Sequence, residues 1–496
     1  MLLIRGGRVV NSQARRADPA DVLIAGDTIF EIGPPGLAAP DDATVIEASQ
    51  RLLIPGLVNA HTHSHGNLPR SLGDRWTLEL ALNGNTAGRE NLTNEDKYLA
   101  AQIGAVEMIR KGCTACYDLI YEFPAPSVDG INAVAQGYSD AGMRAVVAPM
   151  MADGIFYEAV PGLMDALPEA LRAEIERKPR LKRWQAGLDV VRESLHQWSF
   201  DRDRVRMAVA PTIPAHCSDE FLVNAANLSR DYDIGLQTHL AESKVQAIAG
   251  LKLYDKTLTA HLEELAVLGP NFTAAHGVWL DDEDMSRLAD SGSMVAHNPA
   301  SNMRYGSGMA HVRRMIECNL AVGVGTDSRS CSDNLNMFEA MRLASFTSRV
   351  QGPDYKRWLT TDEVFAMATV ESAKVLGMAD SIGVLAPGYK ADIVFLDTRN
   401  PNYVPLTNVM DQIVNAEDGT GVASVMIGGR MVFEDGRMTT LDYDVLVSKI
   451  EIAMERLREK GKQSTALANK LEEIVGSFCV GLAKSPYHVH RYCGLP

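Results

Sequence analysis

The sequence is poor in cysteine and in long apolar runs, and each shortage excludes a class of protein. Only 7 cysteines occur among 496 residues, and most lie inside apolar segments. Such a low, odd number disfavours a disulfide framework and is typical of a reducing compartment. No apolar run reaches the roughly 18 residues of a transmembrane helix. The first ten residues also lack the basic and apolar regions of a signal peptide. We therefore expect a cytoplasmic protein with no membrane partner.

Positive charge is also scarce. The chain has 48 Lys and Arg against 63 Asp and Glu, which gives a formal net charge of −15. An acidic surface repels polyanions, so we expect no nucleic-acid partner. Hydrophobic residues make up 46% and charged residues 22%, as in ordinary globular proteins. The length allows a large α/β barrel and a smaller second domain.

Short strand patterns, separated by Gly, Asp and Pro turns, occur at both ends of the chain. They fall at residues 2–4, 8–10, 22–24, 28–32 and 44–47, and again at 392–396, 424–427 and 430–433. We predict that residues 1–55 and 385–440 pair into one small β-sandwich-like domain. The alternative is two unrelated β appendages.

Between these ends, apolar strand-like runs alternate with helical patterns. The runs cover residues 52–63, 113–119, 144–150, 205–212, 235–239, 271–276, 293–297 and 320–326. Continuous apolar runs are typical of parallel strands buried on both faces. Eight of them with intervening helices predict an α/β protein with a (β/α)₈ TIM barrel over residues 56–384. Residues 441–496 read as a C-terminal helical extension with two amphipathic helices and an irregular tail.

One helix of this barrel can be predicted in detail. Thr93 is a suitable N-cap, and Glu95 and Asp96 suit the positive end of the helix dipole. Apolar residues at positions 99, 103, 106 and 109 form one helical face. Gly112 is placed to terminate the helix.

Histidines gather at the predicted carboxyl ends of strands. The sequence has 12 histidines, and five of them occupy such ends, as does one aspartate: His61, His63, His239, His276, His297 and Asp327. The carboxyl ends of barrel strands converge on the face where barrel active sites lie. His61 and His63 alternate along one strand, so both imidazoles can reach one ion.

The segment Leu53-Ile-Pro-Gly-Leu-Val-Asn-Ala-His-Thr-His63 resembles the first barrel strand of the amidohydrolase superfamily. The closest resemblance is to its branch of cytosine, guanine and S-adenosylhomocysteine deaminases and triazine hydrolases. Further motifs follow in the order of that family, namely Gln237-Thr-His-Leu-Ala-Glu242, Ala275-His-Gly-Val278, Ala296-His-Asn-Pro-Ala-Ser-Asn302 and Gly325-Thr-Asp-Ser328. The resemblance extends to about residue 435.

The resemblance implies a site residue by residue. It makes the metal ligands His61, His63, His239 and Asp327. Glu242 would shuttle protons, His276 would contact the attacking water or the substrate, and Asp327 would also act as a base. Binuclear relatives use a lysine at the end of the fourth strand, but residues 205–219 contain none. We therefore expect one divalent ion, Zn²⁺, with Fe²⁺ as the alternative.

The substrate contacts are predicted more weakly. The resemblance suggests that Glu90 reads the edge of a heterocycle, with a helix-start acid as the alternative. His297 and Asn302 lie in a motif of the family, and Trp76 could stack on an aromatic substrate or simply pack. The family often has a histidine just after Pro211, where this chain has Thr212. His216, four residues later, is the candidate to face the pocket and contact the substrate instead.

These residues predict hydrolytic deamination of a small aminated N-heterocycle, such as a pyrimidine, purine, pterin or s-triazine. The metal would lower the pKa of a bound water, and a protonated Glu242 could donate to a ring nitrogen. One alternative keeps this chemistry but cleaves another C–N bond or a C–Cl bond. A second alternative is a non-catalytic assembly protein of the same fold. We also expect a homodimer or a higher homo-oligomer.

Overall fold

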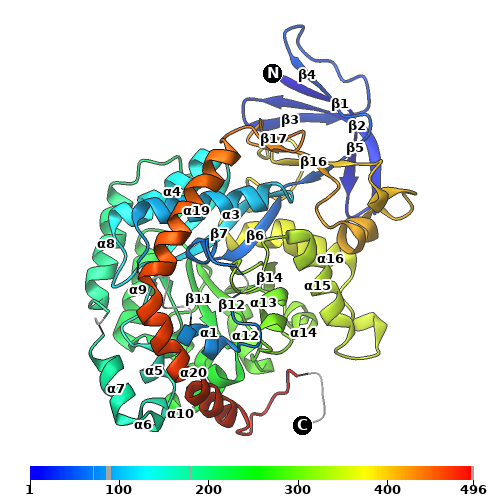
Figure 1. Cartoon of the computed structure of the whole chain (residues 1–496). Helices are drawn as coiled ribbons and strands as arrows, with labels where there is room; N and C mark the ends of the chain where they lie inside the picture. The colour runs from blue at the N-terminus through cyan, green and yellow to red at the C-terminus, as the bar shows by residue number, and fades with distance from the viewer. Residues whose placement is uncertain (71, 85–90, 179–180, 493–496) are drawn as a thin grey trace.

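The computed structural model of the chain describes residues 1–496 except 71, 85–90, 179–180 and 493–496. It contains a barrel of parallel strands surrounded by helices, with a separate sheet at one side (Figure 1). The barrel strands are β6 (Leu57–Thr62), β7 (Cys113–Tyr121), β8 (Arg144–Met151), β9 (Val205–Met207), β10 (Ala210–Pro211), β11 (Leu236–Leu240), β12 (Phe272–His276), β13 (Met294–His297) and β14 (Ala321–Val324). The short strands β9 and β10 together occupy the fourth position.

Backbone hydrogen bonds close the barrel. One parallel sheet runs in the order β10-β8-β7-β6, and the other in the order β11-β12-β13-β14. The amide of Val209 donates to the carbonyl of Gly235 at 2.9 Å and joins the two sheets at the fourth strand. The amide of Asp327 donates to the carbonyl of His61 at 3.0 Å and joins the last strand to the first. The predicted TIM barrel is confirmed.

The two chain ends form one further sheet. Its order is β18-β17-β16-β15-β5-β1-β2-β3, with β4 beside β1. These strands are β1 (Leu2–Asn11), β2 (Arg16–Ala25), β3 (Thr28–Gly33), β4 (Thr44–Glu47), β5 (Arg51–Pro55), β15 (Ile393–Asp397), β16 (Val422–Ile427), β17 (Arg430–Glu434) and β18 (Arg437–Met438). The antiparallel pair of β15 and β5 joins the two ends, with Ile393 opposite Pro55.

Two strand predictions need correction. The run 52–63 is not one strand, because β5 belongs to the terminal sheet and β6 to the barrel. The break falls at Gly56, where a Cβ atom would lie 2.0 Å from Oγ1 of Thr114. Only glycine allows this close approach. Residues 2–4 and 8–10 are parts of the single strand β1.

The helices cover the outside of the barrel (Figure 1). The predicted helix is confirmed as α3, and Thr93 and Asp96 form a reciprocal capping box at its start. The helices are α1 (Leu78–Gly84), α3 (Asn94–Ile109), α4 (Val128–Ala141), α5 (Phe156–Ala159), α6 (Leu163–Ala166), α7 (Glu169–Glu176), α8 (Trp184–His196), α9 (Asp219–Asp231), α10 (Lys244–Tyr254), α11 (Leu258–Glu264), α12 (Asp282–Asp290), α13 (Pro299–Arg304), α14 (Val312–Glu317), α15 (Met337–Arg349), α16 (Thr361–Ala366), α17 (Ser372–Val375), α18 (Val409–Asp411), α19 (Tyr443–Lys460) and α20 (Lys462–Ala483).

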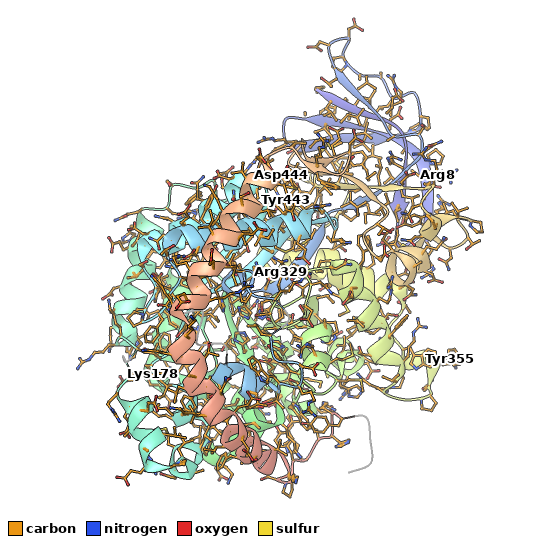
Figure 2. The ribbon with its side chains drawn as sticks, viewed as in Figure 1. Arg8, Lys178, Arg329, Tyr355, Tyr443 and Asp444 are labelled. Atoms are coloured by element: carbon orange, nitrogen blue, oxygen red, sulfur yellow. The ribbon has the colours of Figure 1, made fainter. Side chains whose placement is uncertain are left out.

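The C-terminal extension packs along the barrel as two long helices. Tyr443 and Asp444 stand at the start of α19 (Figure 2). Helix α20 then lies against α1 and α10, at the barrel end that carries the histidines. The side-chain amide of Asn83 in α1 donates to the carbonyl of Ala468 in α20 at 3.0 Å. The extension therefore supports α1 from outside.

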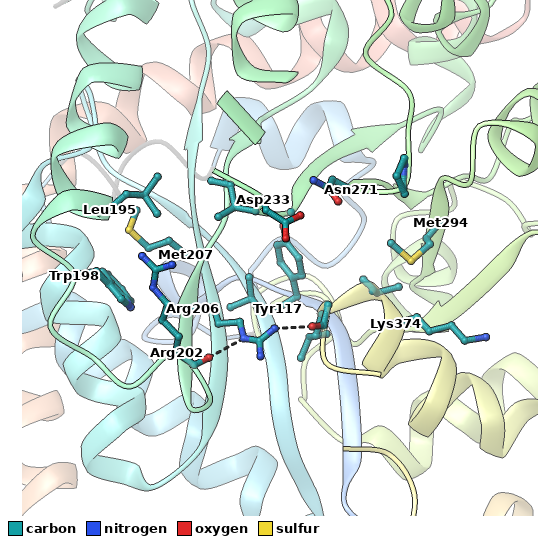
Figure 3. Close-up of a pocket in the computed structure, with 17 residues that line it drawn as sticks. Tyr117, Leu195, Trp198, Arg202, Arg206, Met207, Asp233, Asn271, Met294 and Lys374 are labelled. Atoms are coloured by element: carbon teal, nitrogen blue, oxygen red, sulfur yellow. Dashed lines mark hydrogen bonds between the residues drawn. The ribbon is translucent and has the colours of Figure 1, made fainter. Parts of the chain in front are cut away.

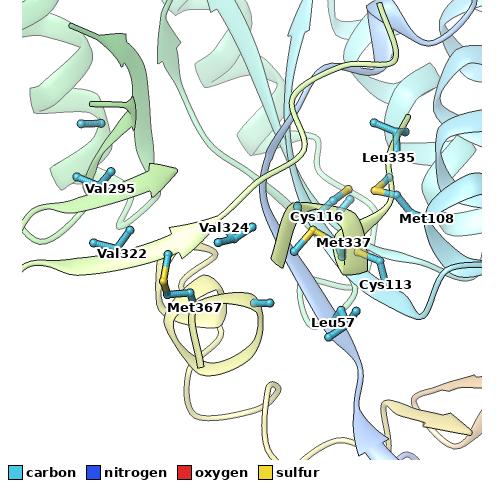
Figure 4. Packing of buried hydrophobic residues seen from close by; sticks show 14 of the residues in the cluster. Leu57, Met108, Cys113, Cys116, Val295, Val322, Val324, Leu335, Met337 and Met367 are labelled. Atoms are coloured by element: carbon cyan, nitrogen blue, oxygen red, sulfur yellow. The ribbon is translucent and has the colours of Figure 1, made fainter. Parts of the chain in front are cut away.

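The barrel core is apolar and contains the thiols of Cys113 and Cys116. Figure 4 shows both cysteines close to Leu57, Met108 and Met337. Both thiols are buried and free, and burial raises the pKa of Cys113 to about 12. Both cysteines therefore pack as small apolar side chains. Among the helices that the structure describes, none is long and apolar enough to cross a membrane.

Candidate metal centre

Three histidines meet at the carboxyl end of the barrel. His61 lies near the end of β6, His63 directly follows it, and His239 lies near the end of β11. One ring nitrogen from each of the three histidines lies within 4.8 Å of the other two. The Nε2 atoms of His63 and His239 are 3.1 Å apart. Two ring nitrogens at this distance can bind one cation between them.

A hydrogen bond on the far side of each ring fixes its orientation. Nδ1 of His63 lies 2.7 Å from the carbonyl of Leu119, and Nδ1 of His239 lies 2.6 Å from the carbonyl of Thr212. A carbonyl accepts only, so both Nδ1 atoms carry the proton. Nδ1 of His61 similarly contacts Oε1 of Gln237 at 2.6 Å. Outer bonds of this kind hold metal-binding histidines in one tautomer, with Nε2 left for the ion.

The ring of His61 shows that this cluster fits a cation. Its Nε2 atom is buried and has no hydrogen-bond partner in the described part of the chain. Burial lowers the pKa of His61 to about 4, so the ring is neutral at physiological pH. Neutral imidazole nitrogens and a carboxylate are a donor set that suits Zn²⁺ or Fe²⁺.

Asp327 supplies the carboxylate. It follows β14 with a left-handed φ of 59°, an uncommon conformation that is concentrated at functional sites. Its Oδ1 atom accepts the amide of Ser328 at 2.7 Å and lies 3.5 Å from Nε2 of His63. Burial alone would raise the pKa of Asp327, but the surrounding imidazoles hold it below its usual value. The carboxylate is therefore ionised.

Glu242 and His276 lie next to the cluster. Nε2 of His276 is 3.7 Å from Oε2 of Glu242, and His276 also groups with His61 and Asp327 within 4.8 Å. Burial raises the pKa of Glu242 well above its usual value, and the charges of Asp327 and Glu79 add to the effect. Burial thus favours the protonated form of Glu242, which can donate a proton.

A cavity of about 70 Å³ opens onto these groups. Apolar side chains from α1 and from the strand ends form much of its wall, among them Leu78, Ala81 and Met150. The polar groups in its lining include His63, His239, Glu242, His276 and Asp327. An apolar pocket with a few convergent polar groups is typical of a small-molecule site.

The sequence model of the amidohydrolase family matches residues 52–432 of this chain. The chain belongs to the amidohydrolase family. The candidate metal ligands lie at the carboxyl end of the barrel strands, where active sites of such barrels lie.

Two relatives of the chain are named as deaminases of adenosine derivatives. The chain is 32% identical to the 5'-deoxyadenosine deaminase of Methanothermobacter thermautotrophicus, over 92% of this chain and 98% of that protein. It is 31% identical to the 5-methylthioadenosine/S-adenosylhomocysteine deaminase of Desulforamulus reducens, over 92% of this chain and 99% of that protein. The prediction of an amidohydrolase that acts on non-peptide C–N bonds is confirmed.

Solved structures share the fold. An adenosine deaminase from Xanthomonas campestris with bound zinc has a TM-score of 0.81 and 23% identity, over 92% of this amidohydrolase and 98% of that chain. An atrazine chlorohydrolase from Arthrobacter aurescens TC1 complexed with zinc has a TM-score of 0.81 and 25% identity, over 91% and 100% of the two chains.

The predicted substrate contacts of this amidohydrolase fall in different places. Asn302 does not line the cavity; its Oδ1 atom lies 2.8 Å from Nδ1 of His276. His297 is buried at the end of β13 and is also absent from the cavity lining. Asn302 therefore orients His276 from behind. Neither ring nitrogen of His297 has a hydrogen-bond partner among the described residues, and its predicted contact with the substrate stays a prediction.

Trp76 and His216 lie near the cavity without lining it. Trp76 packs beside Ala81, Tyr305 and Cys331, so packing is the interpretation that the structure favours. His216 lines a neighbouring small cavity together with Glu79, and burial lowers its pKa to about 4. Glu90 lies outside the described residues.

Two buried polar residues were missed by the sequence reasoning. His65 lines the metal cavity, with its ring centroid 5.2 Å from that of His63. The alternation His61-Thr-His63-Ser-His65 could have indicated it. Glu79 in α1 accepts a hydrogen bond from Oγ of Ser243 at 2.6 Å. No motif marks Glu79, because its burial depends on how α1 covers the strand ends.

Proposed function

We propose that this amidohydrolase removes the exocyclic amino group of an adenosine derivative that is modified at the ribose 5' position. The reaction adds water to the ring carbon and releases ammonia. The observation that carries the proposal is the buried carboxyl of Glu242, 3.7 Å from His276 in a cavity that the candidate metal ligands line. The two nucleoside deaminases that cover nearly the whole chain support the choice of substrate.

We propose one Zn²⁺ ion, held by His61, His63, His239 and Asp327. Three observations support this. One ring nitrogen from each histidine lies within 4.8 Å of the others, and Nε2 of His61 has no hydrogen-bond partner among the described residues. The two similar solved structures contain zinc. When bound, such an ion acts as a Lewis acid that makes a water molecule nucleophilic near neutral pH. The catalytic unit in this proposal is the barrel of residues 56–384.

The protein groups then divide the proton transfers. Asp327 is ionised and accepts a proton from the attacking water. Glu242 is protonated and donates its proton to a ring nitrogen of the heterocycle, so that the ring can accept electrons as its carbon is attacked. Asn302 holds His276 so that Nε2 of the ring faces the reacting atoms. The apolar wall from α1 excludes bulk water from this exchange.

Ammonia release tests the proposal. The purified zinc-loaded protein is incubated with adenosine, 5'-deoxyadenosine, 5'-methylthioadenosine, S-adenosylhomocysteine, cytosine, guanine and aminopterin-type pterins. We expect the highest kcat/KM with a 5'-modified adenosine, and conversion of the adenine ring to hypoxanthine by absorbance. Equal or higher kcat/KM with a pyrimidine or pterin would contradict the assignment.

A second candidate is hydrolysis of a substituted s-triazine. The likeness to the atrazine chlorohydrolase, at 25% identity and a TM-score of 0.81, favours its inclusion. Atrazine therefore joins the panel, with chloride release as the readout. Chloride release without ammonia release from any nucleoside would replace the first proposal with this one.

A further inference from the structure

A second cavity lies at the opposite end of the barrel from the metal centre. Its volume is about 350 Å³, and its walls come from the starts of several barrel strands and from the segment after α8 (Figure 3). Gly235 in this wall directly precedes β11, whereas His239 lies near its other end. Four residues of strand separate the two sites by about 13 Å. The cavity is therefore separate from the chemistry at the metal.

Tyr117 presents an unpartnered donor to this cavity. Its side chain is 1% exposed, and its hydroxyl has no hydrogen-bond partner among the residues that the structure describes. Burial raises the pKa of the phenol, so the hydroxyl keeps its proton. A Cβ atom at Gly235 would lie 2.7 Å from this hydroxyl, so the glycine keeps the space beside it open. Buried polar groups normally have partners, which indicates a ligand atom here.

Two arginines give the cavity a positive charge. Arg206 donates from Nε to the carbonyl of Arg202 at 2.7 Å and from Nη1 to the carbonyl of Gly377 at 2.6 Å, as Figure 3 shows. Neither carbonyl cancels its charge, and the nearest carboxylate oxygen, on Asp203, is 4.0 Å from Nη2.

The side chain of Arg202 also lines the cavity, and no ion pair is found for it within the described ranges. Lys374 is neutralised by Glu371 at 2.8 Å. Asp233 is the single acidic residue in the described lining, so the two arginines outweigh it.

Apolar side chains form the rest of the wall. Trp198, Met207 and Met294 are labelled around the cavity in Figure 3. The indole N–H of Trp198 is already used, since it donates to the carbonyl of Val205 at 3.0 Å. The ring therefore offers its apolar surface and not a donor.

We propose that this cavity binds a small organic anion, a carboxylate or a phosphate monoester with an apolar or aromatic body. The anionic head pairs with the guanidinium groups of Arg202 and Arg206. The body packs on Trp198 and the methionines, and the hydroxyl of Tyr117 donates to an acceptor atom of the ligand. The site is separate from the metal centre and needs no assumption about the reaction there.

Isothermal titration calorimetry of the zinc-loaded protein tests the site with three probes: benzoate, phenyl phosphate and inorganic phosphate. We expect saturable binding of benzoate or phenyl phosphate, whichever head group the arginines prefer, and weaker binding of inorganic phosphate. Arg202→Gln and Tyr117→Phe should each weaken the binding about tenfold, the size expected for one lost hydrogen bond to a charged ligand.

The matched control is Arg192→Gln. It removes one positive charge from a half-exposed residue of α8 that does not line the cavity. Far-UV circular dichroism and a thermal unfolding midpoint that are unchanged in all three variants show that they are folded. Equal affinities in Arg202→Gln, Tyr117→Phe and Arg192→Gln would overturn the proposal. So would the absence of saturable binding, or its loss in His239→Ala with the arginines intact, which would assign the anion to the metal.

Discussion

Nδ1 of His276 lies 2.8 Å from Oδ1 of Asn302. Since an amide oxygen accepts only, this contact places the proton on Nδ1 and leaves Nε2 for the reacting groups. His276 also has a left-handed φ of 73°, so its backbone conformation is unusual as well. Two features therefore orient the His276 ring: its own backbone conformation and the side chain of Asn302 in α13.

Asn302→Ala should therefore reduce kcat without removing the metal. We expect a loss of about 10- to 100-fold, the usual range for a residue that orients a group at a metal site. Steady-state kinetics and metal analysis of the same preparation measure both effects. Full activity in Asn302→Ala would show that the ring needs no such support.

Glu242→Gln should abolish proton donation while it preserves the size of the side chain. We expect kcat to fall by about 10²- to 10⁴-fold, as for the loss of a general acid. The zinc content should not change. The matched control is Glu473→Gln on the exposed side of α20. A Glu242→Gln variant as active as this control would contradict the role of Glu242.

The barrel and the terminal sheet are joined by a buried ion pair. Nε and Nη2 of Arg144 in β8 lie 2.7 and 2.9 Å from the carboxylate of Asp392, and both side chains are 2% exposed. Arg144→Met leaves this carboxylate buried without its cation, so we expect a loss of about 3–5 kcal/mol in the free energy of unfolding.

The double variant Arg144→Met with Asp392→Leu removes both charges and should lose less stability than Arg144→Met alone. Urea denaturation of the two variants and the wild type gives the comparison. A loss in Arg144→Met no larger than that in the double variant would mean that the pair does not couple the two parts.

Asp284 predicts a particular pH dependence of stability. Burial raises its pKa from 3.8 to about 6, although Oγ1 of Thr257 donates to it at 2.6 Å. Because the folded state holds the proton more tightly, stability falls as the pH rises from about 4 to about 6. In Asp284→Asn, the decrease in the free energy of unfolding over this pH range should be smaller by about 1–3 kcal/mol. Urea denaturation at pH 4.5 and pH 7 measures it, and identical pH dependence in both proteins would contradict the prediction.

The gathering of the candidate metal ligands could be predicted from the sequence because barrel geometry brings strand ends together. His61, His63, His239 and Asp327 each follow or end an apolar run, and the motif around His61 is specific. The roles of Asn302 and Glu79 could not be predicted in this way. Asn302 belongs to a recognisable motif, but its contact with His276 depends on where the short helix α13 packs. The burial of Glu79 depends in the same way on how α1 packs, and no local sequence pattern encodes such packing.

The boundary between β5 and β6 was missed for a related reason. Residues on both sides of Gly56 are apolar, so the pattern 52–63 continues through the change of sheet. Only the close approach to Thr114 marks the break. The cytoplasmic location and the homo-oligomeric state stay predictions from composition and from the resemblance.

The central claim is that four side chains hold one catalytic ion. Metal analysis of the wild type and of His239→Ala, joined to the ammonia-release assay, tests it most directly. The control is His196→Ala, a histidine that contacts Tyr232 outside the barrel mouth. We predict one zinc ion per chain in the wild type and the control, and loss of both zinc and activity in His239→Ala. Full zinc content together with full activity in His239→Ala would contradict the account.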